Sequence, residues 1–135
     1  MVKLNKTWNV NDSSPSPKWI LDMYHDYFDP CPLDDNPKFD GLSIPWKKYN
    51  YVNPPYSNKV PWIKKAIEEQ KKGNLTVMLL PFVPDAVWYF DLVVPNAEIL
   101  GFRGRLELDN GKHGRYGSML CVFHPITELM DCESK

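Results

Sequence analysis

The sequence predicts an α/β domain with a mostly parallel sheet, flanking helices and an antiparallel hairpin at its C-terminal end. Three observations lead to this class. Short apolar runs alternate with segments of helical periodicity, as in parallel strands joined by right-handed crossovers. The run at 75–80 is almost wholly apolar, which is typical of a strand covered on both faces. Near the end of the chain, a glycine-rich connection at 109–115 separates two strand-like segments.

The first half of the domain is predicted to hold one helix, two short strands and a long loop. Pro17 suits the first turn of a helix, and apolar side chains then repeat at helical spacing: Trp19, Ile20, Met23, Tyr24 and Tyr27. Residues 28–32 are predicted as a short strand ending in a proline-containing turn. Residues 33–48 are predicted as a loop with a turn at 40–43. The second strand is predicted at 49–52, where Tyr49, Tyr51 and Val52 suit a sheet.

The second half is predicted to continue the alternation. A helix is expected at 57–72, ended by Gly73, because its apolar side chains share one face. The apolar strand at 75–80 follows, then a helix from Pro84 to about Val93 and a short strand at 98–102. The hairpin is expected at 105–123, with residues 119–123 as its buried returning arm.

Composition is that of a globular protein of one domain. The 135 residues are 43% apolar, with no apolar run of membrane-spanning length. A polar arm is expected at 1–14, one domain at 15–124 and a tail at 125–135. The start of the sequence lacks the apolar stretch of a secretory signal, and the odd number of cysteines, three, favours a reducing compartment, so the expected location is cytoplasmic. A net charge of −1 gives no overall attraction to nucleic acid, so a basic contact surface would be local.

The stretch at 53–56, Asn-Pro-Pro-Tyr, is predicted to form a rigid polar turn at the end of the second strand. Asn53 precedes a proline, which favours an extended conformation. Pro54 and Pro55 donate no backbone hydrogen bonds, so the chain must leave the sheet there. In open α/β sheets, ligands bind at this carboxyl edge. The alternative is a proline-rich turn preceded by a capping Asn.

Such a turn suits methyl transfer to the exocyclic amine of adenine. The lone pair of this amine is delocalised into the ring, so an enzyme must accept both N–H bonds and turn the lone pair toward a methyl donor. Asn53 Oδ1 and the Pro54 carbonyl are two acceptors on one rigid frame. Tyr56 can stack on a base that has left the duplex. The remaining task is to align amine and methyl group at about 3–3.5 Å, with no general base before the transfer.

Several separated motifs together resemble the phage-type DNA N6-adenine methyltransferase family, a compact branch of the Rossmann-like methyltransferases that use S-adenosylmethionine. The resemblance covers residues 16–123 and depends on the order of these pieces: Ser16-Pro17, Phe28-Asp29, Asp40-Gly41-Leu42, Trp46, Asn53-Pro54-Pro55-Tyr56-Ser57, Pro61-Trp62, Leu79-Leu80-Pro81, Arg103-Gly104-Arg105 and Ser118. The Asn-Pro-Pro-Tyr motif alone also occurs in RNA and protein-glutamine methyltransferases, so by itself it indicates only the reaction type.

The resemblance implies a reduced Rossmann-like methyltransferase fold and a role for individual residues. At the target amine it implies Asn53, Pro54, Pro55 and Tyr56. Near the cofactor, S-adenosyl-L-methionine, it implies Ser16, Pro17, Asp29, Cys31, Asp40 and Asn53. A carboxylate at a strand end, such as Asp29, can accept hydrogen bonds from the ribose diol or the amino-acid head of the cofactor. The alternative for Asp29 is an Asx-type turn before Pro30, and Asp40 has a similar turn alternative.

The sequence also departs from larger methyltransferases. No Gly-x-Gly cofactor loop occurs, and only one predicted strand precedes the strand at 49–52. There is no room for a separate target-recognition domain, so sequence preference would come from short loops, from a homodimer or from a partner subunit. DNA contacts are expected from a local basic group: Lys59, Arg103, Arg105, Lys112 and Arg115. The alternative for most of this group is a solvated hairpin tip.

The function expected from these patterns is S-adenosylmethionine-dependent methyl transfer to the N6 amine of adenine in DNA. One alternative is an amino-methyltransferase that acts on RNA or protein glutamine. Another is a cofactor-deficient DNA-binding or partner-activating subunit of the same fold. The His and Cys residues show no metal-ligand spacing, so no metal is expected. The kinship suggests a phage or viral source, with the host cell cytoplasm as location.

Overall fold

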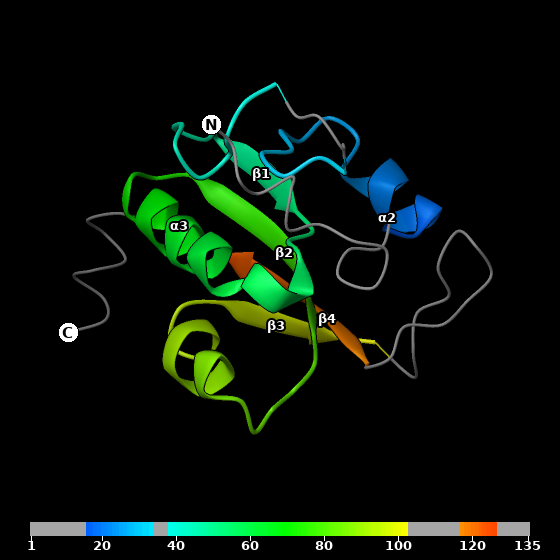
Figure 1. Ribbon diagram of the computed structural model, residues 1–135, viewed down its shortest axis with the longest axis vertical. Helices are drawn as coiled ribbons and strands as arrows, with labels where there is room; N and C mark the ends of the chain where they lie inside the picture. Colours follow the sequence, from blue (N-terminus) through cyan, green and yellow to red (C-terminus); the bar gives the residue numbers. More distant parts are fainter. Residues whose placement is uncertain (1–15, 34–37, 103–116, 127–135) are drawn as a thin grey trace.

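The computed structural model describes residues 16–33, 38–102 and 117–126 of the chain. Along these residues the helices and strands are, in order, α2 (Lys18–Met23), β1 (Tyr49–Val52), the 3-10 helix η1 (Tyr56–Asn58), α3 (Val60–Lys71), β2 (Leu75–Pro81), the π-helix η2 (Tyr89–Val93), β3 (Glu98–Gly101) and β4 (Ser118–Phe123). Figure 1 shows α3 lying over β2, with the η2 segment beside β3. The α/β class predicted from the sequence is confirmed.

The sheet is mixed, with the strand order β1-β2-β4-β3. β1 and β2 are parallel, whereas β4 pairs antiparallel with both β2 and β3. The prediction of a mostly parallel sheet is therefore wrong for the strand pairings, because β4 inserts between two strands that run in the same direction. β4 can occupy this position because all six of its residues, Ser-Met-Leu-Cys-Val-Phe, are buried.

The predicted C-terminal hairpin is partly correct. Its returning arm is confirmed as β4, and that strand has an antiparallel neighbour from the chain just before it. The neighbour is β3 rather than a strand starting at residue 105. The predicted first arm and the glycine-rich connection lie outside the described residues.

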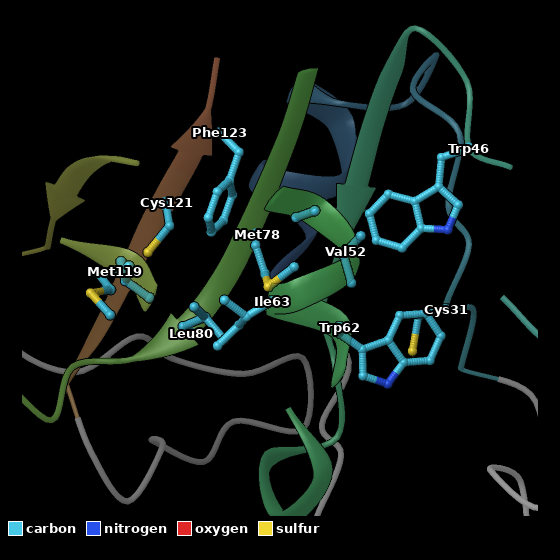
Figure 2. Close-up of a cluster of buried hydrophobic side chains, with 12 residues drawn as sticks. Cys31, Trp46, Val52, Trp62, Ile63, Met78, Leu80, Met119, Cys121 and Phe123 are labelled. Carbon is cyan, nitrogen blue, oxygen red and sulfur yellow. The ribbon is translucent and has the colours of Figure 1, made fainter. Parts of the chain in front are cut away.

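Both faces of the sheet are covered, as the apolar sequence of β2 predicts. Met78 and Leu80 point to the cluster built with α3 and η2, whereas Val77 and Leu79 point to the cluster on the opposite face. Figure 2 shows the first cluster, where Ile63 from α3 meets Met78 and Leu80. Ile20 from α2 belongs to the second. The layers are therefore α2, the sheet, and α3 with η2.

Two elements are shorter than the sequence predicts. Helix α2 ends at Met23 instead of continuing to Tyr27, because Tyr24 leaves the helical conformation and stacks on Tyr51 at 5.3 Å between ring centroids. The strand predicted at 28–32 is reduced to one parallel bridge between Phe28 and Asn50. Prolines at positions 30 and 32 have no N–H to donate, so the pairing cannot extend.

The other predicted helices are found in modified form. The helix expected at 57–72 begins as η1 and continues as α3, and Gly73 ends it with a φ of 91°. The helix expected from Pro84 to Val93 is a turn followed by η2, where the Val94 N–H donates to the Tyr89 carbonyl at 2.9 Å. No helix within the described ranges is long and apolar enough to cross a membrane.

Candidate active site

The Asn-Pro-Pro-Tyr turn lies directly after β1, at the carboxyl edge that β1 shares with β2. Pro54 and Pro55 are buried, whereas Asn53 and Tyr56 are partly exposed. Pro55 is extended, with φ −63° and ψ 132°, and its carbonyl accepts the Asn58 N–H at 3.1 Å to begin η1. The turn therefore ends the strand as predicted and keeps the Asn and Tyr side chains within reach of a ligand.

The Asn53 amide is oriented by a hydrogen-bonded chain of side chains. Asn53 Nδ2 donates to Ser16 Oγ at 3.1 Å, and Ser16 Oγ lies 2.8 Å from the Tyr51 hydroxyl. Ser16 and Tyr51 are both 4% exposed. Because the nitrogen of the amide faces Ser16, its oxygen points to the other side of the amide group.

Tyr56 is anchored at its hydroxyl. This hydroxyl hydrogen-bonds the Ser118 side chain at the start of β4, and burial raises the pKa of the phenol. The ring makes no ring–ring contact with the described aromatic side chains. The phenol is therefore neutral at physiological pH, and its ring is held by β4 from one end.

Lys59, predicted to contact DNA, is built into the turn. Its ammonium donates to the Tyr56 carbonyl at 2.8 Å and lies 5.0 Å from the centroid of the Trp88 ring. These contacts favour a role in holding η1 against the segment before η2. The four arginine and lysine residues predicted with it, Arg103, Arg105, Lys112 and Arg115, lie outside the described residues.

Asp29 lies at the same edge of the sheet as Asn53. The preceding residue, Phe28, exchanges backbone hydrogen bonds with β1: its N–H donates to the Tyr49 carbonyl at 3.0 Å, and its carbonyl accepts the Tyr51 N–H at 2.9 Å. Because this bridge is parallel, the segment from Phe28 to Asp29 runs in the same direction as β1. Asp29 therefore lies toward the end of β1 at which Asn53 follows. Asp29 also acts electrostatically on the Tyr51 hydroxyl, whose pKa is raised mainly by burial.

Hydrogen bonds to the Asp29 carboxyl make up for only part of the hydration that it loses to the surrounding protein. Oδ1 accepts the Cys31 N–H at 2.9 Å, so the predicted Asx-type turn is present. The side chain keeps contact with solvent, but surrounding protein desolvates it and raises its pKa from 3.8 to about 6, against the opposing effect of the Cys31 N–H. Cys31 itself is buried, and this burial raises the pKa of its thiol.

Asp40 caps a turn with both of its carboxylate oxygens. Oδ1 accepts the Leu42 N–H at 3.0 Å, and Oδ2 accepts the Ser43 hydroxyl at 2.9 Å. The next residue, Gly41, packs so closely that a Cβ there would lie 1.8 Å from the Pro30 carbonyl oxygen. The turn alternative for Asp40 is therefore realised, and the turn supports the loop that carries Asp29 and Cys31.

The sequence analysis assigned no site role to three residues around this site, Tyr51, Ser118 and Gly41, although the last two stand among the motif residues. Tyr51 could have been found, since residues two apart on a strand share a face and Tyr51 precedes Asn53 by two. Ser118 and Gly41 contact the site only through tertiary packing. No group of three or more His, Cys, Asp or Glu side chains that could hold a metal occurs in the described part of the chain.

Comparison with known families identifies the class of this protein. The family model of DNA N-6-adenine-methyltransferase (Dam) matches residues 18–130. Because the match covers most of the chain, the protein belongs to this family and is a DNA adenine methyltransferase.

Two phage proteins are related to the chain. It is 28% identical over 148 aligned positions to the DNA N-6-adenine-methyltransferase of Haemophilus phage HP1, an alignment that covers 93% of this chain and 86% of the relative. It is 29% identical over 90 positions to the DNA N-6-adenine-methyltransferase of Escherichia phage T1, covering 65% of this chain and 38% of that protein. No solved structure matches the chain significantly.

Proposed function

We propose that the protein transfers a methyl group from S-adenosylmethionine to the N6 amine of an adenine that has been flipped out of a DNA duplex. Asn53 Oδ1 and the Pro54 carbonyl would accept the two N–H bonds of the amine, and the Tyr56 ring would stack on the base. The observation that carries the proposal is the orientation of the Asn53 amide, whose nitrogen is occupied by Ser16. With its nitrogen on Ser16, the amide directs its oxygen to the opposite side, as the proposed contact with the target amine requires.

The chemistry needs positioning more than acid–base catalysis. Accepting both N–H bonds of the amine localises its lone pair on nitrogen and directs that pair out of the ring plane. Pro54 and Pro55 are buried and conformationally restricted, so the two acceptors hold their spacing. A rigid frame of this kind aligns nucleophile and methyl group without entropy loss at the moment of reaction.

The anchored Tyr56 suits base capture. Its hydroxyl bond to Ser118 fixes the ring relative to β4, so a flipped base meets a preformed surface. Stacking on an aromatic side chain contributes about 1–3 kcal/mol per base in single-stranded nucleic acid. This contribution offsets part of the cost of unpairing and unstacking the adenine.

The residues near Asn53 fit the proposed cofactor. S-adenosylmethionine supplies an electrophilic methyl group on a sulfonium. Asp29 has a partly desolvated carboxyl with one protein donor, so hydrogen bonds from an ammonium or a ribose diol would stabilise its ionised form. Cys31 is hydrogen-bonded to Asp29 through its backbone N–H, and the Ser16-Pro17 segment is proposed near the cofactor through its contact with Asn53. Asp40 is a weaker candidate for direct contact, because both of its oxygens cap its own turn.

The strand directions are consistent with a reduced Rossmann-like methyltransferase. β1, β2 and β3 run in the same direction, and α3 makes the crossover between the parallel pair β1 and β2. β4 is the reversed strand. The site then lies at the carboxyl ends of the parallel strands, where ligands bind in open α/β sheets.

The test is Asn53→Ala, with Asn96→Ala in the loop before β3 as the matched control. We expect Asn53→Ala to reduce transfer to unmethylated DNA by at least about a hundredfold, by analogy with the loss of one essential acceptor or donor in an active site. Calorimetry should show that S-adenosylmethionine binding weakens far less than the transfer rate, because Asn53 is one of several residues proposed near the cofactor. Digestion of DNA methylated by the wild-type enzyme should yield N6-methyladenine. Near-normal transfer by Asn53→Ala, or a methylated RNA nucleoside as the main product, would contradict the proposal.

A further inference from the structure

The hydrogen-bonded chain behind Asn53 has a geometry that the proposed chemistry requires. Tyr51 and Asn53 are two residues apart on the same side of the β1 strand and its extension. Ser16 comes from a segment 37 positions earlier and lies between them, within 2.8 Å of the Tyr51 hydroxyl and 3.1 Å of Asn53 Nδ2. The three side chains thus form a continuous path from the buried core to the candidate active site.

The inner end of this path is rigid. Tyr51 packs in the apolar cluster with Val77 and Leu79, and its ring stacks on Tyr24 with an interplanar angle of 10°. Burial raises the pKa of the Tyr51 phenol, so the hydroxyl keeps its proton across the neutral pH range. Ser16 therefore faces a partner that changes neither position nor charge.

The amide of Asn53 needs such a support because its two ends have nearly the same shape. If the amide turned by 180°, an N–H group would face the target amine, and donor would meet donor. When the Ser16 hydrogen is donated to the Tyr51 oxygen, the Ser16 hydroxyl has only lone pairs left for Asn53, so the amide must present its nitrogen. This arrangement selects the productive orientation, and the Tyr51 oxygen is needed for it because a Ser16 hydrogen without that acceptor could bond a flipped Asn53 oxygen.

We infer that Ser16 and Tyr51 are positioning residues, which hold the Asn53 amide with its oxygen toward the target amine. This inference rests on the proposed function of Asn53 and assigns the Ser16 hydroxyl to the amide rather than to the cofactor. Neither side chain touches the substrate. Their effect on the reaction passes through Asn53.

The experiment compares Ser16→Ala, Ser16→Thr and Tyr51→Phe in the full chain, with Tyr27→Phe as the control for loss of a tyrosine hydroxyl. Methyl transfer is measured with labelled S-adenosylmethionine and unmethylated bacterial chromosomal DNA. Loss of one orienting hydrogen bond should lower kcat about tenfold in Ser16→Ala and somewhat less in Tyr51→Phe. KM for S-adenosylmethionine and for DNA should stay within about twofold, because only the amide orientation changes.

Three further measurements separate positioning from a structural or cofactor role. Ser16→Thr keeps the hydroxyl and should retain most of the kcat that Ser16→Ala loses. The double variant Ser16→Ala/Tyr51→Phe should lose little more than Ser16→Ala alone, because both act through the same amide. In spectra of the enzyme labelled with ¹⁵N-asparagine, the Asn53 side-chain N–H bonded to Ser16 should exchange slowly with solvent, and this protection should disappear in Ser16→Ala.

Each alternative result has a definite meaning. A rise in KM and Kd for S-adenosylmethionine in Ser16→Ala at unchanged kcat would place the hydroxyl at the cofactor and overturn the inference. Near-normal kcat in both single variants would overturn it as well. If Asn53→Ala itself were active, the proposed function would fail first. If Asn53→Ala is inactive and the Ser16 and Tyr51 variants are normal, only the positioning role fails.

Discussion

At the scale of single residues, the candidate site is defined by what each polar side chain already binds. Both carboxylate oxygens of Asp40 accept hydrogen bonds within its own turn. The Lys59 ammonium donates to the Tyr56 carbonyl and contacts the Trp88 ring. Asp29 accepts one backbone N–H through its carboxylate. The side chains with remaining capacity are the ones that can bind a ligand, which is why Asp29 is the stronger cofactor candidate.

The raised pKa of Asp29 predicts a pH-dependent stability. Between the ordinary pKa of 3.8 and the folded value of about 6, the folded state binds more protons than the unfolded state. The free energy of unfolding therefore falls as the pH rises through this range. Asp29→Asn keeps the acceptor for Cys31 and removes the charge, so its Tm should exceed that of the wild type at pH 7.5. Solvent contact screens the effect, so the difference should be small.

Thermal unfolding between pH 4 and pH 8 checks this prediction, with Asp91→Asn as the control at an exposed position. The Tm difference between Asp29→Asn and the wild type should shrink as the pH falls below about 6 and vanish near pH 4. A difference that stays constant with pH would refute the assigned cause. Loss of S-adenosylmethionine binding in the same variant would support the proposed contact independently.

At the scale of elements, the loops on the sheet edge are stabilised by contacts between one another. The turn at 40–43 packs against the Pro30 backbone, and the Trp46 indole N–H donates to the Gly41 carbonyl at 2.8 Å. Trp46 in turn lies beside Trp62 of α3, at 6.3 Å between ring centroids (Figure 2). Through these contacts, α3 supports a loop that belongs to a different part of the sequence.

Gly41→Ala is predicted to displace the loop that carries Asp29. The added Cβ would meet the Pro30 carbonyl oxygen at 1.8 Å and Trp62 at 2.9 Å, and neither backbone nor a buried indole can move easily. We expect a loss of stability of about 1–3 kcal/mol, measured by urea unfolding, together with weaker S-adenosylmethionine binding by calorimetry.

The control for this variant is Gly101→Ala in β3, where an added Cβ meets nothing within 4 Å. Its stability and binding should stay close to those of the wild type. Equal effects of the two substitutions would show that loss of glycine flexibility matters, rather than the contact with Pro30.

At the scale of the whole molecule, one sheet joins the two apolar clusters and the edge that carries the candidate active site. Met78 is fully buried in β2, and residues of this strand contribute to both clusters. Unfolding of the core and of the site should therefore be one cooperative event, as in most single domains of this size.

Met78→Ala tests this cooperativity. The cavity should cost about 2–5 kcal/mol, and far-UV circular dichroism and tryptophan fluorescence should shift to the same lower urea midpoint. The control is Val87→Ala, because Val87 is 75% exposed. The urea midpoint of this variant should equal that of the wild type. Separate midpoints for the two signals would contradict a single cooperative unit.

Elements whose cause is local could be predicted from the residues alone. Periodicity and composition predicted α3, β1, β2 and the burial of β4, and two successive prolines predicted where β1 must end. The ordered motifs also predicted the family, because a motif is a property of the chain and needs no coordinates.

The strand pairings and the long-range side-chain partners could not be predicted in this way and are known from the three-dimensional structure. Nothing in the residues of β4 states that it inserts between β2 and β3, because a buried apolar strand satisfies parallel and antiparallel neighbours equally well. The end of α2 at Met23 depends on a stacking partner 27 positions away from Tyr24, on β1. In the same way, Ser16 reaches Asn53 across 37 positions, since hydrogen bonds between distant segments depend on packing, which local sequence patterns do not encode.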